Sequence, residues 1–260
     1  ASRGLGDVYK RQEEEKVYSE KKILFGQKYP AKNYLGITEG ENKMKDEKIS
    51  NYVKLCEDWA DKFMKMDLEN LRKRVPELKE EKGFFTLVHF GRKYGISLKN
   101  GRICSMDGQR EPDTTEMLNI YTLLGYAKEG AFFMNKWVPF ADLRNARPFA
   151  PAYKVGETDV FGATFSGHEK ELREAFGKLG GKELPQGDVG YEIRAFECMP
   201  MRFFFWERDE EFEAQGNILF DYSATDFNHV ESAVSIADAG IRRLAELADL
   251  PVRGKSFRMK

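Results

Sequence analysis

The stretch Met199–Asp221 reads MPMRFFFWERDEEFEAQGNILFD, and the rest of the chain is interpreted around it. It begins with the most apolar strand candidate in the chain, continues through a tight acidic cluster and ends in a second short apolar segment. Two apolar segments separated by a polar turn predict an antiparallel hairpin. Because Phe203–Trp206 put aromatic bulk on both faces of the first strand, we expect this strand to lie in the middle of a sheet that is covered on both sides.

The residues before this hairpin change from a helical to an extended pattern. Apolar side chains recur at three- and four-residue steps over residues 52–66, which predicts an amphipathic helix, and Asp67 is placed to cap a second one. Residues 84–90, 93–98 and 102–106 then read as three short strands of a meander. The Asn100-Gly101 pair is typical of a type I′ turn between the last two strands.

The remaining elements complete an α+β pattern. Asp113 with Glu116, and Asn228 with Glu231, have the spacing of capping boxes at the starts of two helices. Residues 144–164 are aperiodic and contain prolines, which predicts a long loop. Strands grouped between helices, without strict alternation, favour an α+β fold: a mainly antiparallel sheet with a central aromatic hairpin, covered by several helices.

The two ends of the chain differ in character from its middle. Residues 1–12 resemble a translated sequencing adapter of the kind found in metagenomic assemblies, so we treat them as an artefact. We expect residues 13–49 to be a charged, flexible N-terminal arm and residues 50–252 to be a single α+β domain. Residues 253–260 form a basic C-terminal tail.

Composition limits the classes of partner and the compartment. The 42 Lys and Arg residues nearly balance the 43 Asp and Glu residues, so neither nucleic acid nor a membrane surface is an expected partner. No apolar run approaches the roughly 20 residues that span a bilayer. Cys56, Cys104 and Cys198 are scattered and form no Cys-x-x-Cys motif, which predicts a cytoplasmic protein that holds no zinc or iron–sulfur cluster by itself.

The chain resembles the domain-of-unknown-function 3786 family over about residues 51–250. The segments that carry the resemblance are Met199–Met201, Trp206–Phe212, Ile218–Asp221, Ser223-Ala224, Tyr52–Leu55, Tyr94–Leu98 with Gly101, and Trp137–Phe140. The resemblance implies no particular activity. Some relatives look joined to cysteine-rich iron–sulfur segments in anaerobic bacteria and archaea, which implies an accessory role to redox or cofactor proteins. Since this chain lacks those cysteines, an iron–sulfur partner would be a separate protein.

The acidic turn suggests one function, a carboxylate-based enzyme. Glu207, Asp209, Glu210 and Glu211 could serve as acid–base groups or bind a metal ion. A tight hairpin, however, would put Asp221 opposite Arg202, some 15–20 Å from the turn at about 3.3 Å per residue, so one ion could not reach both groups. We therefore expect a structural Arg202–Asp221 pair and a solvated acidic tip, and we assign no metal site.

A binding module is the leading hypothesis. The chain has no phosphate-binding loop, no dinucleotide-binding glycine motif and no Gly-x-Ser-x-Gly elbow, so no cofactor is assigned. The predicted loop over residues 144–164 would meet the sheet with Arg144, Arg147 and Tyr153 as exposed polar anchors for a ligand or a protein partner. A carboxylate-based enzyme, with or without a metal ion, is the alternative.

Overall fold

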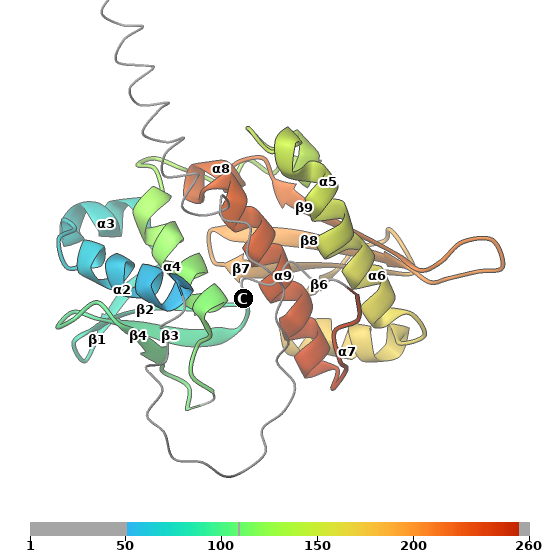
Figure 1. Cartoon of the computed structure of the whole chain (residues 1–260), viewed down its shortest axis with the longest axis horizontal. Coiled ribbons are helices and arrows are strands. Elements are labelled where there is room, and N and C mark those ends of the chain that lie inside the picture. Colours follow the sequence, from blue (N-terminus) through green and yellow to red (C-terminus); the bar gives the residue numbers. More distant parts are fainter. Residues whose placement is uncertain (1–50, 109, 255–260) are drawn as a thin grey trace, which may run out of the picture. The chain divides into compact units, whose positions relative to one another are not determined.

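A computed structural model of the chain describes residues 51–108 and 110–254, all of which belong to one compact unit, Lys48–Lys260 (Figure 1). The predicted adapter, the N-terminal arm and most of the basic tail lie outside the described residues. Among the described residues, no helix is both long and apolar enough to cross a membrane.

The first half of the described chain forms a four-stranded antiparallel sheet in the order β1-β2-β3-β4. Its strands are β1 (Lys79–Glu81), β2 (Phe84–His89), β3 (Arg92–Ser97) and β4 (Ile103–Ser105), and the helices packed with it are α2 (Asn51–Phe63), α3 (Leu68–Arg74) and α4 (Thr114–Tyr126). The predicted three-strand meander is confirmed, and β1 adds a strand that the sequence did not predict. The predicted type I′ turn is wrong, because Gly101 has a positive φ of 70° and Asn100 does not.

The second half forms a five-stranded antiparallel sheet in the order β5-β9-β8-β7-β6. Its strands are β5 (Trp137–Pro139), β6 (Lys182–Glu183), β7 (Val189–Phe196), β8 (Met199–Trp206) and β9 (Gln215–Asp221). The α+β class and the central aromatic hairpin are therefore confirmed, with the strands divided between two antiparallel sheets. β8 lies in the middle of the second sheet, as its aromatic residues predicted.

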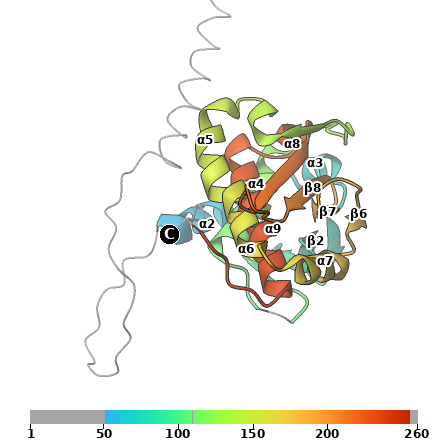
Figure 2. The same ribbon diagram turned by 90° about the vertical axis from the view of Figure 1, so that its right-hand side faces the viewer.

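Helices cover one face of this second sheet (Figures 1 and 2). These are α6 (Asp159–Phe165), α7 (Glu169–Lys178) and α9 (Val230–Leu247). Phe203 of β8 contacts Phe161 of α6 and Phe176 of α7, with ring centroids 5.6 and 5.9 Å apart. The opposite face carries the half-buried Arg202 and Trp206, whose side chain is 40% exposed. Phe204 on the same face is buried, so β8 is covered on both faces over only part of its length, and the expectation of full cover is wrong at Arg202 and Trp206.

Most of the predicted loop over residues 144–164 is helical, from residue 147 onward. These residues form two short helices (η2, Arg147–Phe149, and α5, Ala150–Tyr153), a π-helical turn (η3, Lys154–Thr158) and then α6; a single 3-10 turn, η1 (Phe140–Asp142), precedes them. Prolines occupy first-turn positions of η2 and α5, where no intrahelical N–H donor is needed. Burial of apolar side chains against the sheet stabilises helices that the local pattern does not reveal.

The helices α4 and α9 begin at or beside the two predicted capping boxes, and they pack against each other. The capping box at α4 is confirmed, with the Asp113 and Glu116 side chains each bonded to the other's backbone N–H. At α9, which follows the short helix α8 (Ala224–Phe227), the N-cap is His229 and not the predicted Asn228. α9 packs against both α4 and α7, and so connects the helices of the first half to those of the second (Figure 1).

Candidate functional site

The predicted Arg202–Asp221 pair does not form. Arg202 lies opposite Leu219 on β9 and Glu192 on β7, and its Nε donates to the Glu192 carboxylate at 2.9 Å. Asp221 instead lies opposite Trp137 of β5. The turn is centred between Glu210 and Glu211, one residue earlier than the predicted pairing requires, and this shifts the register by two residues.

The buried Asp221 carboxylate fixes the loop that precedes β5. It accepts hydrogen bonds from the backbone N–H groups of Met134, at 3.0 Å, and Lys136, at 2.7 Å. The N–H and hydroxyl of Ser223 donate to the same carboxylate. Asp221 is only 3% exposed, so these bonds take the place of its hydration.

The loop held by Asp221 displays three consecutive apolar side chains to solvent. Phe132 is 65% exposed, Phe133 43% and Met134 37%, and we call these three residues the apolar loop. The Phe133 ring makes an edge contact with Trp137 of β5 at 5.8 Å between centroids. β5 is an edge strand of its sheet, so the apolar loop lies at an open sheet edge.

Basic side chains gather beside the apolar loop. Lys136 and Arg144 stack on the Tyr222 ring, at 4.3 and 4.9 Å from its centroid. Lys128 and Arg144 both form ion pairs with Asp226. Burial alone would raise the pKa of Asp226, but hydrogen bonds from these two cations lower it below its ordinary value. We call Lys128, Lys136 and Arg144 the basic rim.

The three predicted ligand anchors have different positions. Arg144 belongs to the basic rim, and Arg147 is exposed at the start of η2. Tyr153 is buried and stacks on Phe140 with centroids 4.3 Å apart, so the expectation that it is exposed is wrong. The apolar loop was missed because a run of exposed apolar residues has no periodic signal; its local signal was the run Phe132-Phe133-Met134 itself.

The acidic turn is exposed, and two of its carboxylates are engaged in shaping it. Glu207 accepts from the Gly167 N–H at 2.6 Å and from the Ser166 hydroxyl at 3.1 Å. Asp209 accepts from the N–H groups of Glu211 and Phe212. Burial would raise the pKa of Glu207, but the backbone hydrogen bonds and Ser166 lower it.

The acidic candidates are not gathered around one point. Glu210 and Glu211 are exposed and, within the described part of the chain, their carboxylates accept no hydrogen bond. Across residues 51–108 and 110–254, no three His, Cys, Asp or Glu side chains are grouped so that they could hold a metal ion. No described contact thus favours the carboxylate-enzyme alternative.

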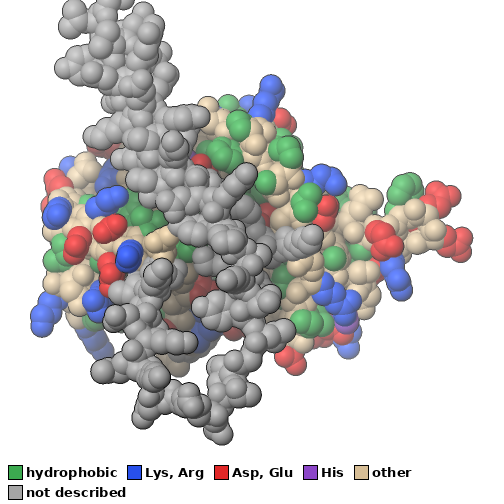
Figure 3. Space-filling model, viewed as in Figure 1, with side chains coloured by type: hydrophobic (Ala, Val, Ile, Leu, Met, Phe, Trp, Pro, Cys, Tyr) green, Lys and Arg blue, Asp and Glu red, His purple; other side chains and the backbone are tan. Residues whose placement is uncertain are grey.

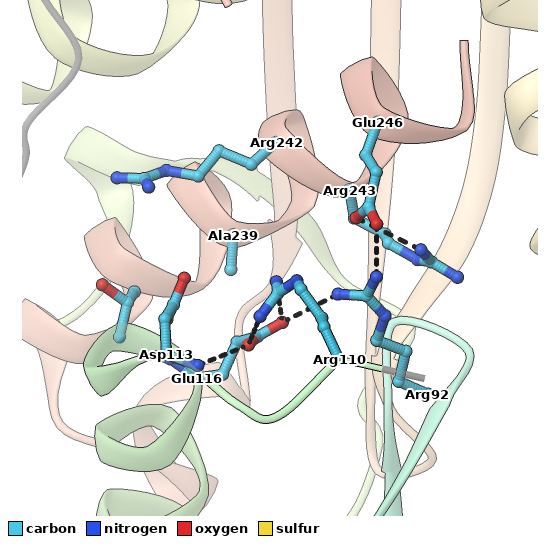
Figure 4. A pocket seen from close by; sticks show the side chains of 9 residues that line it. Arg92, Arg110, Asp113, Glu116, Ala239, Arg242, Arg243 and Glu246 are labelled. Atoms are coloured by element: carbon cyan, nitrogen blue, oxygen red, sulfur yellow. Dashed lines mark hydrogen bonds and ion pairs between the residues drawn. The ribbon is translucent and has the colours of Figure 1, made fainter. Parts of the chain in front are cut away.

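A second cluster of charges lies where α4, β3 and α9 meet (Figure 4). Arg110 donates twice to the Glu116 carboxylate at 2.8 Å, and Arg92 bridges Glu116 to Glu246. Figure 4 shows the Arg242 guanidinium directed away from this network, and it pairs with Asp238 at 2.7 Å. The cavity among these groups is about 20 Å³, enough for about one water molecule. We interpret this network as structural.

Together, the fold and the surface features define an α+β domain of two antiparallel sheets with a fixed, exposed apolar loop at one sheet edge. The chain belongs to the family described as "Domain of unknown function (DUF3786)", whose family model matches residues 67–243, more than half of the chain. The predicted resemblance is confirmed, and the match begins at the cap of α3. No curated protein and no solved structure matches the chain significantly.

Proposed function

We propose that this protein is a cytoplasmic accessory module that binds an acidic protein partner through the apolar loop and the basic rim. The observation that carries the proposal is that the buried Asp221 carboxylate holds the backbone at the end of the exposed apolar loop. Asp221 holds the backbone at Met134 and Lys136, on either side of Asn135, so the loop is anchored although its side chains remain in water. The cytoplasmic assignment rests on three cysteines that are all free thiols.

The energetics favour a protein partner over a small ligand. Contiguous exposed apolar side chains mark interaction sites, and aromatic residues and Met are enriched at the centres of protein interfaces. A loop that is already ordered loses little conformational entropy on binding, which increases affinity for the same contact area. The apolar loop therefore has the composition and the backbone order of an interface centre.

The basic rim specifies the charge of the partner. Lys136 and Arg144 lie on the Tyr222 ring beside the loop, and Asp226 neutralises part of their charge. Charges around an apolar centre steer association and select partners of opposite sign. An iron–sulfur protein is the partner class that the family resemblance implies, and we propose an acidic one because the rim is basic.

Isothermal titration calorimetry with an acidic bacterial ferredoxin, loaded with its cluster, tests the proposal. We expect binding that weakens with added salt, and at least tenfold weaker binding by a Phe132→Ser/Phe133→Ser variant. A Val88→Ser/Val155→Ser variant is the matched control, because it also removes two exposed apolar side chains, 47% and 55% exposed, and should bind like the parent.

The same titration tests the proposed binding surface and the proposed class of partner separately. One outcome is that the ferredoxin does not bind while an acidic peptide rich in Leu and Phe binds through Phe132 and Phe133. In that case the apolar loop is confirmed as a binding surface and the iron–sulfur class of partner is contradicted. If neither probe binds, or both variants weaken binding equally, the proposed function is contradicted.

A further inference from the structure

We propose that the groove beside the β8–β9 turn is a second docking surface and that it binds an arginine- or lysine-containing peptide segment of a partner protein. The groove holds about 560 Å³, within the roughly 300–1,000 Å³ of typical binding sites. Trp206 and Phe212 line it, together with acidic residues that include Asp188 and Glu213 and with the first three residues of β9, Gln215–Asn217. It is separate from the apolar loop and does not depend on the function proposed for that loop.

Two exposed aromatic side chains give the groove surfaces on which cationic groups can bind. Trp206, at the end of β8, is 40% exposed, and Phe212, in the turn, is 60% exposed. The Trp206 ring contacts the buried Phe204 at 6.3 Å between centroids, which limits its movement. Exposed aromatic faces attract guanidinium and ammonium groups, and Trp is the strongest of them.

The charge around the groove selects a cationic occupant. Five of the seven residues 207–213 are acidic and one is basic, and Asp188 adds a further carboxylate to the lining. Figure 3 shows these acidic side chains gathered on the protruding end of the hairpin. A peptide with alternating cationic side chains would meet both aromatic faces and carboxylates.

The carboxylates of this turn fall into two groups. Those of Glu207 and Asp209 accept backbone hydrogen bonds that hold the turn together. Those of Glu210, Glu211 and Glu213 accept none from any described residue, and they are exposed. Glu207 and Asp209 shape the groove. Of the second group, Glu213 lines the groove, and Glu210 and Glu211 belong to the turn beside it, where they add negative charge near a bound peptide.

The groove and the apolar loop lie at opposite ends of β9. The groove includes Gln215 at the beginning of β9, whereas Asp221, which holds the apolar loop, ends the same strand. Six residues of strand separate the two by about 20 Å. A partner could bind at either surface independently.

The test uses a fluorescein-labelled peptide of alternating arginine and glycine, with fluorescence anisotropy at 0.1 M salt as the readout. We expect saturable binding by the full chain and at least a tenfold higher Kd for Trp206→Ala. A Glu210→Gln/Glu211→Gln/Glu213→Gln variant should show a similar loss. Phe212→Ala, a change at an exposed turn residue, gives a second variant should Trp206→Ala fail to fold.

Matched control variants distinguish binding at the groove from non-specific attraction of a cationic peptide to surface carboxylates. Glu57→Gln/Asp58→Asn/Asp61→Asn removes three exposed carboxylates from α2 and should change Kd less than twofold. Phe132→Ser/Phe133→Ser should also leave Kd unchanged, which keeps this test distinct from that of the proposed function. The inference is overturned if the peptide does not bind, if the α2 variant weakens binding as much as the hairpin variant, or if the aromatic substitutions have no effect.

Discussion

At the scale of single residues, the burial of the Glu157 carboxyl group costs the fold stability. Glu157 lies in the π-helical turn η3, it is fully buried, and neither carboxylate oxygen has a hydrogen-bond partner among the described residues. Burial and the nearby Asp238 raise its pKa to about 9, although Arg242 acts in the opposite direction. Glu157 is therefore protonated at neutral pH and lowers the stability of the fold. π-helical turns occur frequently at functional sites, where such costs are tolerated.

Replacing Glu157 by Gln should stabilise the protein, by an amount that depends on pH. Between pH 4.5 and about 9 the unfolded chain has lost the Glu157 proton and the folded chain retains it, so the stability of the parent falls as pH rises. Gln does not titrate and also leaves polar atoms unpaired. We therefore expect Glu157→Gln to match the parent near pH 4 and to exceed it by about 3 kcal/mol at pH 7.

Urea unfolding of both proteins at pH 4, 5.5, 7 and 8.5 measures this difference. Glu174→Gln, an exposed position on α7, is the control and should show no such trend. A stability difference between Glu157→Gln and the parent that stays constant across this pH range would contradict the assignment of a protonated, buried Glu157.

At the level of elements, the β3–β4 turn is built against α2. Gly101 has a φ of +70°, and a Cβ atom added there would lie 2.3 Å from the Ala60 carbonyl oxygen. The Gly101 carbonyl also accepts a hydrogen bond from the Tyr121 hydroxyl of α4 at 2.8 Å. The turn thus needs glycine for two separate reasons, its left-handed conformation and the close approach of a helix.

A pair of substitutions separates these two reasons. Gly108 has nearly the same conformation, with φ +72°, but nothing lies within 4 Å of its Cβ position. Gly108→Ala should therefore cost about 1 kcal/mol, the strain of a left-handed alanine. Gly101→Ala should cost at least about 2 kcal/mol more, because α2 must move as well. Thermal unfolding of the two variants checks this, and equal losses of stability would show that α2 does not constrain the turn.

At the scale of the whole molecule, two helices and a few polar contacts join the sheets. The Phe90 N–H donates to the Ala195 carbonyl of β7 at 3.0 Å, and the His89 Nδ1 contacts the same oxygen at 2.9 Å. Asn119 of α4 is within 3.3 Å of the other His89 nitrogen and of the Ser235 carbonyl on α9. Burial lowers the pKa of His89 to about 4, so this contact is made by a neutral imidazole at pH 7.

The Arg92–Glu116–Glu246 network joins the same halves through charge, and Glu116 is its centre. Glu116→Ala would remove a carboxylate that pairs with the buried Arg92 and would remove half of the α4 capping box. We expect a loss of about 3 kcal/mol, as for other buried ion pairs that lose one partner. Glu80→Ala breaks an exposed pair with Arg72 and should cost less than about 1 kcal/mol. Urea unfolding measures both, and similar losses would mean that the network contributes no more than a surface pair.

Much of the fold was predictable because it depends on local pattern. Periodicity identified the meander, the central hairpin and the final helix, and the capping box at Asp113 was found from spacing alone. The short strand β1 (Lys79–Glu81) was missed because its side chains are charged and carry no apolar alternation. The helices over residues 147–164 were missed because they are stabilised by burial against the second sheet and not by local preference.

The candidate surfaces depended more on tertiary structure. Arg144 and the acidic turn could be singled out from residue type, but the position of the apolar loop could not, because Asp221 reaches it from a strand that lies far away in sequence. The π-helical placement of Glu157 and the burial of Tyr153 also had no sequence signal. Each depends on which side chains of α9 and of the second sheet occupy the same space.

The sequence by itself determined the class of fold, the family and the faces of the strands, because the two-residue period of a strand specifies which side chains point inward. Tertiary structure alone decided the register of the β8–β9 hairpin. A shift of two residues keeps every side chain on its face, so the apolar pattern of Met199–Asp221 is satisfied with Arg202 opposite either Asp221 or Leu219. The geometry of the acidic turn selects Leu219, and this leaves Asp221 free to hold the apolar loop.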